Sequence, residues 1–181
     1  RRMSHSSRQT EFVDSVEIVP LTAAFCPVAS ALHAEGFEDQ DHWSADEMIA
    51  LLDVPGAFGL LAFAPGNEVE NRLDTPLGFI QMQAVLDEAE INTIVVAKEA
   101  RKRGVARKLL FAVFERLHET GVGRVLLEVS KDNAPAIALY RHCCFTEIGR
   151  RKKYYRRKSG REVDALVMER DLGTCVLGWN A

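Results

Sequence analysis

The residues best suited to chemistry form a charged turn between an apolar strand and an amphipathic helix, at residues 101–106. Backbone N–H groups in a turn that opens a helix have no partners inside the helix, so they can bind a phosphate, and the helix dipole favours the negative charge. Gly104 permits a close approach or a positive φ, and Ala106 is small enough not to obstruct. The turn predicts a site for a phosphorylated cofactor, whose affinity should fall if either residue is replaced by one larger than alanine.

Taken alone, the pattern R-x-x-G-x-A fits an ordinary solvated turn better than a cofactor site. The elements around it change that balance. Apolar residues recur at helical spacing after the turn, glycine ends the helix near Gly121, and residues 125–129 have the apolar run of a buried strand. This strand-helix-strand unit predicts two parallel strands joined by a right-handed crossover.

A second set of polar residues begins in that strand at Glu128 and ends at Tyr140. Its pattern is E-V-x-x-x-N-x-x-A-I-A-L-Y, with R-x-x-G-x-A upstream. Together the two motifs resemble those of GNAT-fold N-acetyltransferases, most of all the bacterial ribosomal-protein-alanine N-acetyltransferases (RimI-like). The resemblance covers about residues 86–167, with Trp43 and Ser44 as an echo before it. It implies an α/β fold, with a twisted mixed β-sheet flanked by helices on both faces, and direct acetyl transfer from acetyl-CoA to an amine.

The resemblance also implies roles for individual residues. Glu128 takes the place of the catalytic base, and Tyr140 that of the general acid that protonates the departing thiolate. Asn133 falls on a further cofactor contact. Main-chain groups of the strand before the turn would bind the pantetheine arm of the cofactor, and the turn itself would bind the pyrophosphate. These cofactor-binding positions are Ile94, Val95 and Val96 in the strand, and Lys102, Arg103, Gly104, Val105, Ala106 and Arg107 in the turn and helix start.

Each assignment has a structural alternative. Glu128 could be a paired structural carboxylate, although an acid is costly to bury in an apolar strand without a purpose. Tyr140 could be a core aromatic residue, and without the resemblance that interpretation would be preferred. Asn133 also suits the cap of the helix that follows it. Cys144 stands where the family usually has glycine, so the turn before Phe145 is expected to be altered.

Length and composition fit one globular domain. The chain has 181 residues, 47% of them hydrophobic and 27% charged, and its sequence has no run near the roughly 20 apolar residues that cross a bilayer. We expect a disordered lead-in at 1–12, one acetyltransferase domain at 13–172 and a tail at 173–181. The cysteines form no C-x-x-C pair and the histidines lack metal-ligand spacing. These patterns favour a reduced, cytoplasmic protein with free thiols and no metal.

The rest of the sequence predicts the elements that complete the sheet. One helix is expected at 21–35, and a second after Ser44, where Glu47 completes a capping box. Strands are expected at 16–21, 57–64, 77–85, 90–96, 146–153 and 161–170.

The acceptor is expected to be a protein N-terminal α-amine. Its pKa is about 7.7–8.0 against about 10.4 for lysine, so presenting a neutral lysine amine near pH 7 costs roughly 3.5 kcal/mol more. In the family the acceptor is the N-terminal alanine of a small-ribosomal-subunit protein with a basic N-terminal region. An acidic segment at 35–47 could attract such a peptide, but it fits a solvated loop and helix cap equally well.

Two other functions fit parts of the sequence. A GNAT enzyme could acetylate a small-molecule amine instead of a peptide. The basic segment at 150–161, where Tyr154 and Tyr155 interrupt arginines and lysines, is typical of RNA or ribosome binding, since cations bind phosphates and aromatic rings stack on bases. The tyrosine pair also recurs in the resembling family, where it would shape the acceptor pocket. A salt-sensitive RNA affinity without acetyl-CoA binding would favour the RNA-binding function.

Overall fold

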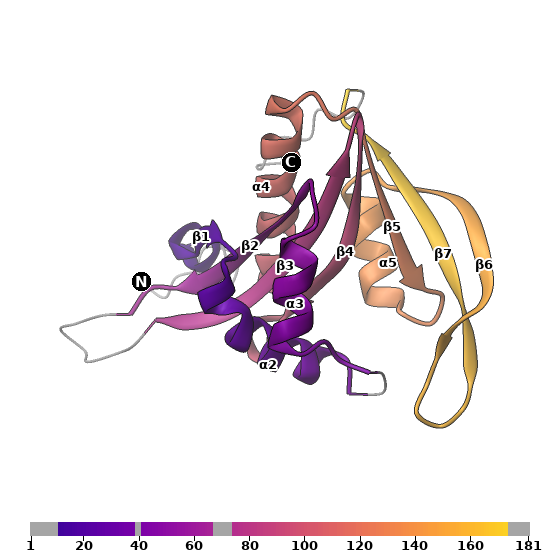
Figure 1. Cartoon of the computed structure of the whole chain (residues 1–181), viewed down its shortest axis with the longest axis horizontal. Coiled ribbons are helices and arrows are strands. Elements are labelled where there is room, and N and C mark those ends of the chain that lie inside the picture. Colours follow the sequence, from indigo (N-terminus) through magenta and orange to yellow (C-terminus); the bar gives the residue numbers. More distant parts are fainter. Residues whose placement is uncertain (1–10, 39–40, 67–73, 174–181) are drawn as a thin grey trace, which may run out of the picture.

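The computed structural model describes residues 11–38, 41–66 and 74–173, which form a seven-stranded sheet with helices around it (Figure 1). In chain order, the strands are β1 (Glu17–Pro20), β2 (Ala57–Ala64), β3 (Thr75–Val85), β4 (Glu88–Val96), β5 (Arg124–Ser130), β6 (Thr146–Arg156) and β7 (Glu162–Asp171). The helices are α2 (Cys26–Gly36), α3 (Ala45–Leu52), α4 (Val105–Glu119) and α5 (Ala134–His142), with 3-10 turns η1 (Ala23–Phe25) and η2 (Lys98–Ala100).

The order of the strands across the sheet is β1-β2-β3-β4-β5-β7-β6. Strands β1 to β4 pair antiparallel in sequence order, and β4 and β5 pair in parallel. Strand β7 then lies antiparallel between β5 and β6. Because α4 connects the two parallel strands, the predicted strand-helix-strand unit is confirmed.

Each face of the sheet has its own apolar core. On one face α4 packs through its apolar stripe, which includes Leu109, Val113 and Leu117, and α5 adds Ile137. On the other face α2 and α3 enclose a smaller cluster around Met48, together with side chains from β2, β3 and β4. The predicted α/β fold, with helices on both faces of a mixed sheet, is therefore confirmed.

The helix expected at 21–35 is the element whose start differs most from the prediction. The α-helix begins only at Cys26, after the 3-10 turn η1, and Pro27 lies in its first turn. Proline lacks an N–H and is tolerated in the first turn of an α-helix but not farther in, so it sets this start. The predicted capping box of α3 is confirmed, because Glu47 N donates to Ser44 Oγ at 3.2 Å and Ser44 N donates to Glu47 Oε2 at 2.7 Å.

The ends of the domain differ from the predicted boundaries. Residues 11–15 are helical, so the predicted lead-in is wrong at Glu11 and Phe12. Phe12 packs against the core on the α4 face, which gives this segment a reason to be ordered. The rest of the lead-in, and the tail beyond Gly173, lie outside the described residues.

The cysteines of the described residues differ in their oxidation state. Cys26 and Cys143 are buried free thiols, but Cys144 is disulfide-bonded, so the expectation of free thiols is wrong there. Sequence spacing excludes only bonds between near neighbours, which is why it missed this one. Cys175 lies outside the described residues. Cys144 has a φ of 62°, so it adopts the left-handed geometry of the glycine that it replaces.

Within the described ranges, no helix is long and apolar enough to span a membrane. Over the same residues, no group of three or more His, Cys, Asp or Glu side chains is arranged to hold a metal ion.

A buried histidine lies between α2 and the segment before α3. His33 is 4% exposed, its ring stacks on Trp43 with centroids 4.9 Å apart, and its Nδ1 accepts a hydrogen bond from Trp43 N at 3.2 Å. Burial, with a smaller contribution from His42, lowers the pKa of His33 to about 4. The His33 ring is therefore neutral in the folded protein at neutral pH.

Stability is expected to fall as the pH is lowered from about 6.5 towards about 4. In this window the unfolded chain binds a proton at His33 that the folded chain excludes, so unfolding becomes easier. Between about pH 7.5 and pH 5 the free energy of unfolding should drop by about 2 kcal/mol from this group. Urea unfolding at both pH values measures the drop. His33→Gln should reduce it, whereas the exposed-site control His142→Gln should not, and equal drops in all three proteins would contradict the prediction.

Candidate active site

Strands β4 and β5 pair over a short stretch and then separate. The last pair of the parallel ladder is Ile91 with Leu127, although β4 continues to Val96 and β5 to Ser130. Figure 1 shows the two strands diverging towards these carboxyl ends. Glu128 is therefore the first residue of β5 beyond the point of separation, which places the predicted base at the vertex of the gap.

Strand β4 is irregular at the same level. Its register with β3 shifts between Gln81 and Met82, so that Asn92 is an extra residue on β4. A bulge of this kind bends a strand and re-aims the residues that follow it. The bulge and the separation of the strands together leave one edge of β4 facing the gap.

Two of the three predicted pantetheine-binding residues have their main-chain groups on that edge. Ala97 N donates to Leu77 O at 2.8 Å, on the β3 side. Backbone groups of alternate residues in an antiparallel pair point to the same edge, so Val95 also faces β3. Ile94 and Val96 are then the two of the predicted residues whose main-chain groups face the gap, and pantetheine binding by these residues stays a prediction.

The turn between β4 and α4 is built to present main-chain N–H groups. Lys102 and Gly104 have φ values of 59° and 89°, and Gly104, the N-cap residue, has no side chain with which to cap α4. The N–H groups of the first turn, from Val105 to Arg107, thus have no acceptor within the helix. No acidic residue lies in that turn to oppose an anion. Its residues fit the pyrophosphate of coenzyme A.

The N-terminal helical segment supports this turn from outside. The Arg103 guanidinium lies 3.3 Å from the centroid of the Phe12 ring, and Lys108 Nζ donates to Val13 O at 2.7 Å. A Cβ added to Gly104 would lie 2.8 Å from Val13 Cγ2. These two cations hold the N-terminal segment, and the pyrophosphate binding implied for the turn stays a prediction.

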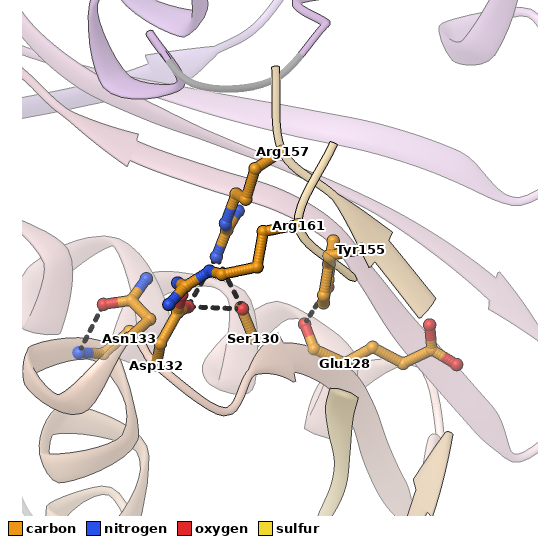
Figure 2. A network of polar contacts seen from close by, with 8 residues as sticks. Glu128, Ser130, Asp132, Asn133, Tyr155, Arg157 and Arg161 are labelled. Atoms are coloured by element: carbon orange, nitrogen blue, oxygen red, sulfur yellow. Dashed lines mark hydrogen bonds and ion pairs between the residues drawn. The ribbon is translucent and has the colours of Figure 1, made fainter. Parts of the chain in front are cut away.

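Glu128 is surrounded by side chains of the β6–β7 hairpin. Its carboxylate, which is 13% exposed, pairs with Arg151, with 2.6 Å between Oε1 and Nε. The Tyr155 hydroxyl donates to the Glu128 carbonyl oxygen at 3.3 Å (Figure 2). A hydrogen bond to the Glu128 carboxylate, followed by burial, raises the pKa of Tyr154. The hairpin thus covers the candidate base.

Tyr140 is buried in α5, on the α4 face of the sheet. Its ring meets Phe145 edge-on, with centroids 5.7 Å apart. Burial, then the neighbouring Tyr155 and Cys143, raises the pKa of Tyr140 far above the ordinary value, so the phenol stays protonated. Tyr140 is thus a core aromatic residue, as the structural alternative predicted, and its role as general acid stays a prediction. Tyr155 donates to the Glu128 carbonyl oxygen and is close enough to Tyr140 to contribute to its raised pKa.

Asn133 caps α5, as the helix-cap alternative predicted. Its Oδ1 accepts a hydrogen bond from Ala136 N at 3.3 Å (Figure 2). The cap fixes the start of the helix that carries Tyr140. The cofactor contact implied for Asn133 stays a prediction.

The acidic segment at 35–47 is partly used within the fold. Glu35 Oε1 accepts a hydrogen bond from Lys98 N at 3.2 Å, and Glu38 pairs with Lys98 Nζ at 2.5 Å. Glu47 belongs to the capping box of α3. At these positions the loop-and-cap interpretation is favoured over the attraction of a basic peptide.

Three residues near the site were not assigned by sequence reasoning. Arg151 pairs with Glu128, and Ser130 and Asp132 bind the hairpin through Arg157. The signal available was the density of charge at 150–161, which did not indicate its partners. Those partners are set by the twist of the hairpin over β5.

Comparison with known proteins places the chain in a family. It belongs to the acetyltransferase (GNAT) family, whose model matches residues 25–145. The chain is 33% identical over 170 residues to the N-alpha-acetyltransferase RimI of Mycobacterium tuberculosis, and this match covers 91% of the chain and 98% of that relative.

Similarity to a protein of Escherichia coli is found both in sequence and in structure. The chain is 41% identical over 90 residues to the [ribosomal protein bS18]-alanine N-acetyltransferase of strain K12, a match that spans 50% of the chain and only 60% of the relative's length. The crystal structure of the ribosomal-protein-S18-alanine N-acetyltransferase from Escherichia coli superposes with a TM-score of 0.75 and 26% identity. That superposition covers 92% of this chain and 98% of the other.

Proposed function

We propose that this protein transfers an acetyl group from acetyl-CoA to a protein N-terminal α-amine, and that its acceptor is the N-terminal alanine of a small-ribosomal-subunit protein. Such an acceptor implies a cytoplasmic enzyme. The observation that carries the proposal is the gap between β4 and β5, with Glu128 at its vertex and the uncapped start of α4 beside it. The names of the relatives in Mycobacterium tuberculosis and Escherichia coli support the choice of acceptor.

The residues around the gap divide the chemistry among them. Glu128 accepts a proton from the acceptor amine, directly or through a water molecule, so that the amine can attack the thioester carbonyl. Backbone N–H groups at the β4 bulge stabilise the negative charge that develops on the carbonyl oxygen. Tyr140 donates its proton to the departing thiolate. Acetyl-CoA supplies the activated acetyl group, and its pyrophosphate would be held by the main chain from Lys102 to Arg107, with its pantetheine arm along Ile94 and Val96.

An α-amine suits this site better than a lysine side chain. The lower pKa of the α-amine leaves less work for a carboxylate base, by roughly 3.5 kcal/mol near pH 7. Tyr154 and Tyr155, which lie against Glu128, would form the acceptor-side wall.

The RNA-binding alternative is weakened by the ion pairs of the hairpin. Basic residues that would have to contact phosphates are instead paired with carboxylates of the domain. The pairs are Arg150 with Glu147, Arg151 with Glu128, Lys153 with Glu162, and Arg157 and Arg161 with Asp132. Charges already neutralised within the protein release fewer counterions on binding a nucleic acid.

Intact-mass analysis tests the proposal. The enzyme is incubated with acetyl-CoA and a basic peptide that begins with alanine, and one acetyl group should be added at the N-terminus. The same peptide with a blocked N-terminus keeps its lysines and should stay unmodified. Acetylation of polyamines in preference to the peptide would favour the small-molecule alternative, and a salt-sensitive RNA affinity without acetyl-CoA binding would favour the RNA-binding one.

Tyr140→Phe is expected to lower kcat by about 10²-fold, within the range for loss of a general acid. The ring remains packed on Phe145, so the melting temperature and the Kd for acetyl-CoA should change little. Steady-state kinetics with the alanine peptide, together with calorimetric titration of acetyl-CoA, measure both quantities. An unchanged kcat would assign Tyr140 to packing alone.

A further inference from the structure

Asp132 joins the turn after β5 to the β6–β7 hairpin. Its Oδ1 accepts hydrogen bonds from Ser130 Oγ at 2.6 Å and Arg157 Nη2 at 2.5 Å, and its Oδ2 accepts one from Arg161 Nη2 at 2.5 Å (Figure 2). Arg157 also donates to Ser130 Oγ at 2.7 Å. The Arg157 side chain is only 13% exposed, so this contact is shielded from solvent and is screened less by salt than a surface pair. We call these four residues the Asp132 cluster.

The backbone ladder of the hairpin is irregular, so contacts outside the ladder contribute to the position of the hairpin. Its register passes from Arg151 with Ala165 to Tyr155 with Val163, so β6 holds extra residues between these pairs. Lys153, in that stretch, has a φ of 53°. Extra residues of this kind interrupt the backbone ladder and bend the strand, and here Lys153 N donates to Asp164 Oδ1 at 3.0 Å.

The anchor lies next to the candidate base. Side chains alternate along a strand, so Ser130 and Glu128 point to the same face of β5, roughly 7 Å apart along it. Arg157 holds Ser130, and Tyr155, just before it on the same hairpin, donates to the Glu128 carbonyl oxygen. The place of the tyrosine beside Glu128 therefore depends on how Asp132 holds the hairpin.

We infer that Asp132 is a positioning residue for the acceptor, which fixes the β6–β7 hairpin so that Tyr154 and Tyr155 form a rigid wall for the first residues of the peptide. The inference rests on the proposed function and deepens it. The hydrogen bond from Ser130, then that from Arg157, lowers the pKa of Asp132, so the carboxylate is ionised at neutral pH and can hold both arginines. Partly exposed ion pairs contribute little net stability, so the role inferred for the Asp132 cluster is to fix the position of the hairpin.

The test is Asp132→Asn, which keeps the shape of the side chain and removes its charge. The KM for the alanine peptide should rise about tenfold, as expected for loss of a charge-assisted contact. Since Asp132 does not touch the reacting groups, kcat and the Kd for acetyl-CoA should stay within about twofold. Hydrogen exchange in the segment 150–161 should become faster, which reports the loosened hairpin without any need for activity.

Two further variants serve as a control and as a substitute for Asp132→Asn. Glu162→Gln removes the carboxylate that pairs with Lys153 in the same hairpin but leaves the Asp132 cluster intact, so KM should not change. If Asp132→Asn does not fold, Arg161→Gln removes only the outer contact and should raise KM about threefold. A peptide KM unchanged in the folded Asp132 or Arg161 variant, with an active wild type, overturns the role of Asp132. A wild type that acetylates no peptide overturns the proposed function, and the acceptor role with it.

Discussion

Replacing Glu128 with glutamine is expected to lower kcat for peptide acetylation by about 10²–10⁴-fold, the range for loss of a general base. Glutamine matches the side chain in shape but cannot accept the proton of the amine. The Glu128 carboxylate pairs with Arg151 of the hairpin, at the vertex of the gap, whereas the cofactor pyrophosphate is expected to bind at the turn before α4. The Kd for acetyl-CoA should therefore change little, which separates loss of chemistry from loss of binding. Single-turnover kinetics and calorimetric titration measure the two quantities.

A matched control is needed because Glu128→Gln also breaks an ion pair. Glu169 lies on the neighbouring strand β7, is 29% exposed and pairs with Arg124 at 3.6 Å, away from the gap. Glu169→Gln removes an ion-paired carboxylate of the same sheet and should leave kcat unchanged. Equal losses of kcat in the two variants would mean that loss of an ion pair in the sheet, and not loss of the base, lowers kcat. Full turnover by Glu128→Gln would show that Glu128 is not the base.

Gly104→Val is expected to weaken acetyl-CoA binding by tenfold or more, since the turn would lose charge-assisted hydrogen bonds worth about 1.5–3 kcal/mol each. Gly104 has a φ of 89°, and a Cβ there would lie 2.8 Å from Val13 Cγ2. A left-handed valine costs about 1–2 kcal/mol in backbone strain alone, and the contact with Val13 adds to it. Relief of that contact must displace the turn or the N-terminal segment. The main-chain N–H groups at the start of α4 would then no longer point towards the pyrophosphate.

The far end of the same helix supplies the control. Gly121 has a φ of 81°, and nothing lies within 4 Å of a Cβ added to it. Gly121→Val imposes similar backbone strain without the collision and far from the cofactor turn. Chemical denaturation should show both variants destabilised, Gly104→Val more, while calorimetry shows weakened acetyl-CoA binding only for Gly104→Val. Equal acetyl-CoA affinities in the two variants would argue against a role for the turn.

The parts of the fold that could be predicted are those that local sequence determines. The capping box of α3 needs only Ser44 and Glu47. The helix with Leu109, Val113 and Leu117 on one stripe follows from periodicity, and the strand after it from an apolar run. The assignment of Glu128 as the base could not be made from local sequence alone. An acid in an apolar strand can also be a paired structural carboxylate, and only the family motif favoured catalysis.

What could not be predicted depends on residues that meet across the sheet. The parallel ladder ends at Ile91 because β4 and β5 stay paired only that far. How far two strands stay paired depends on both of them and cannot be read from the residues of one strand. The pair of Arg151 with Glu128 depends on the twist of an irregular hairpin. The helical segment that holds Phe12 on Arg103 has too few residues to be stable by itself, so its order comes from packing against α4.

Strand β6 lies at one edge of the sheet, where, among the described residues, only β7 pairs with it. An edge strand offers unpaired backbone groups that can recruit a strand from a second molecule, and consecutive like charges oppose such growth. Strand β6 is exposed along most of its length and carries Arg150, Arg151, Lys152 and Lys153 in succession. Two copies that approach edge to edge through this strand would have to bury the ion pairs that Arg150, Arg151 and Lys153 make with carboxylates, and burying paired charges costs desolvation energy. The charged run therefore opposes self-assembly at this open edge of the sheet.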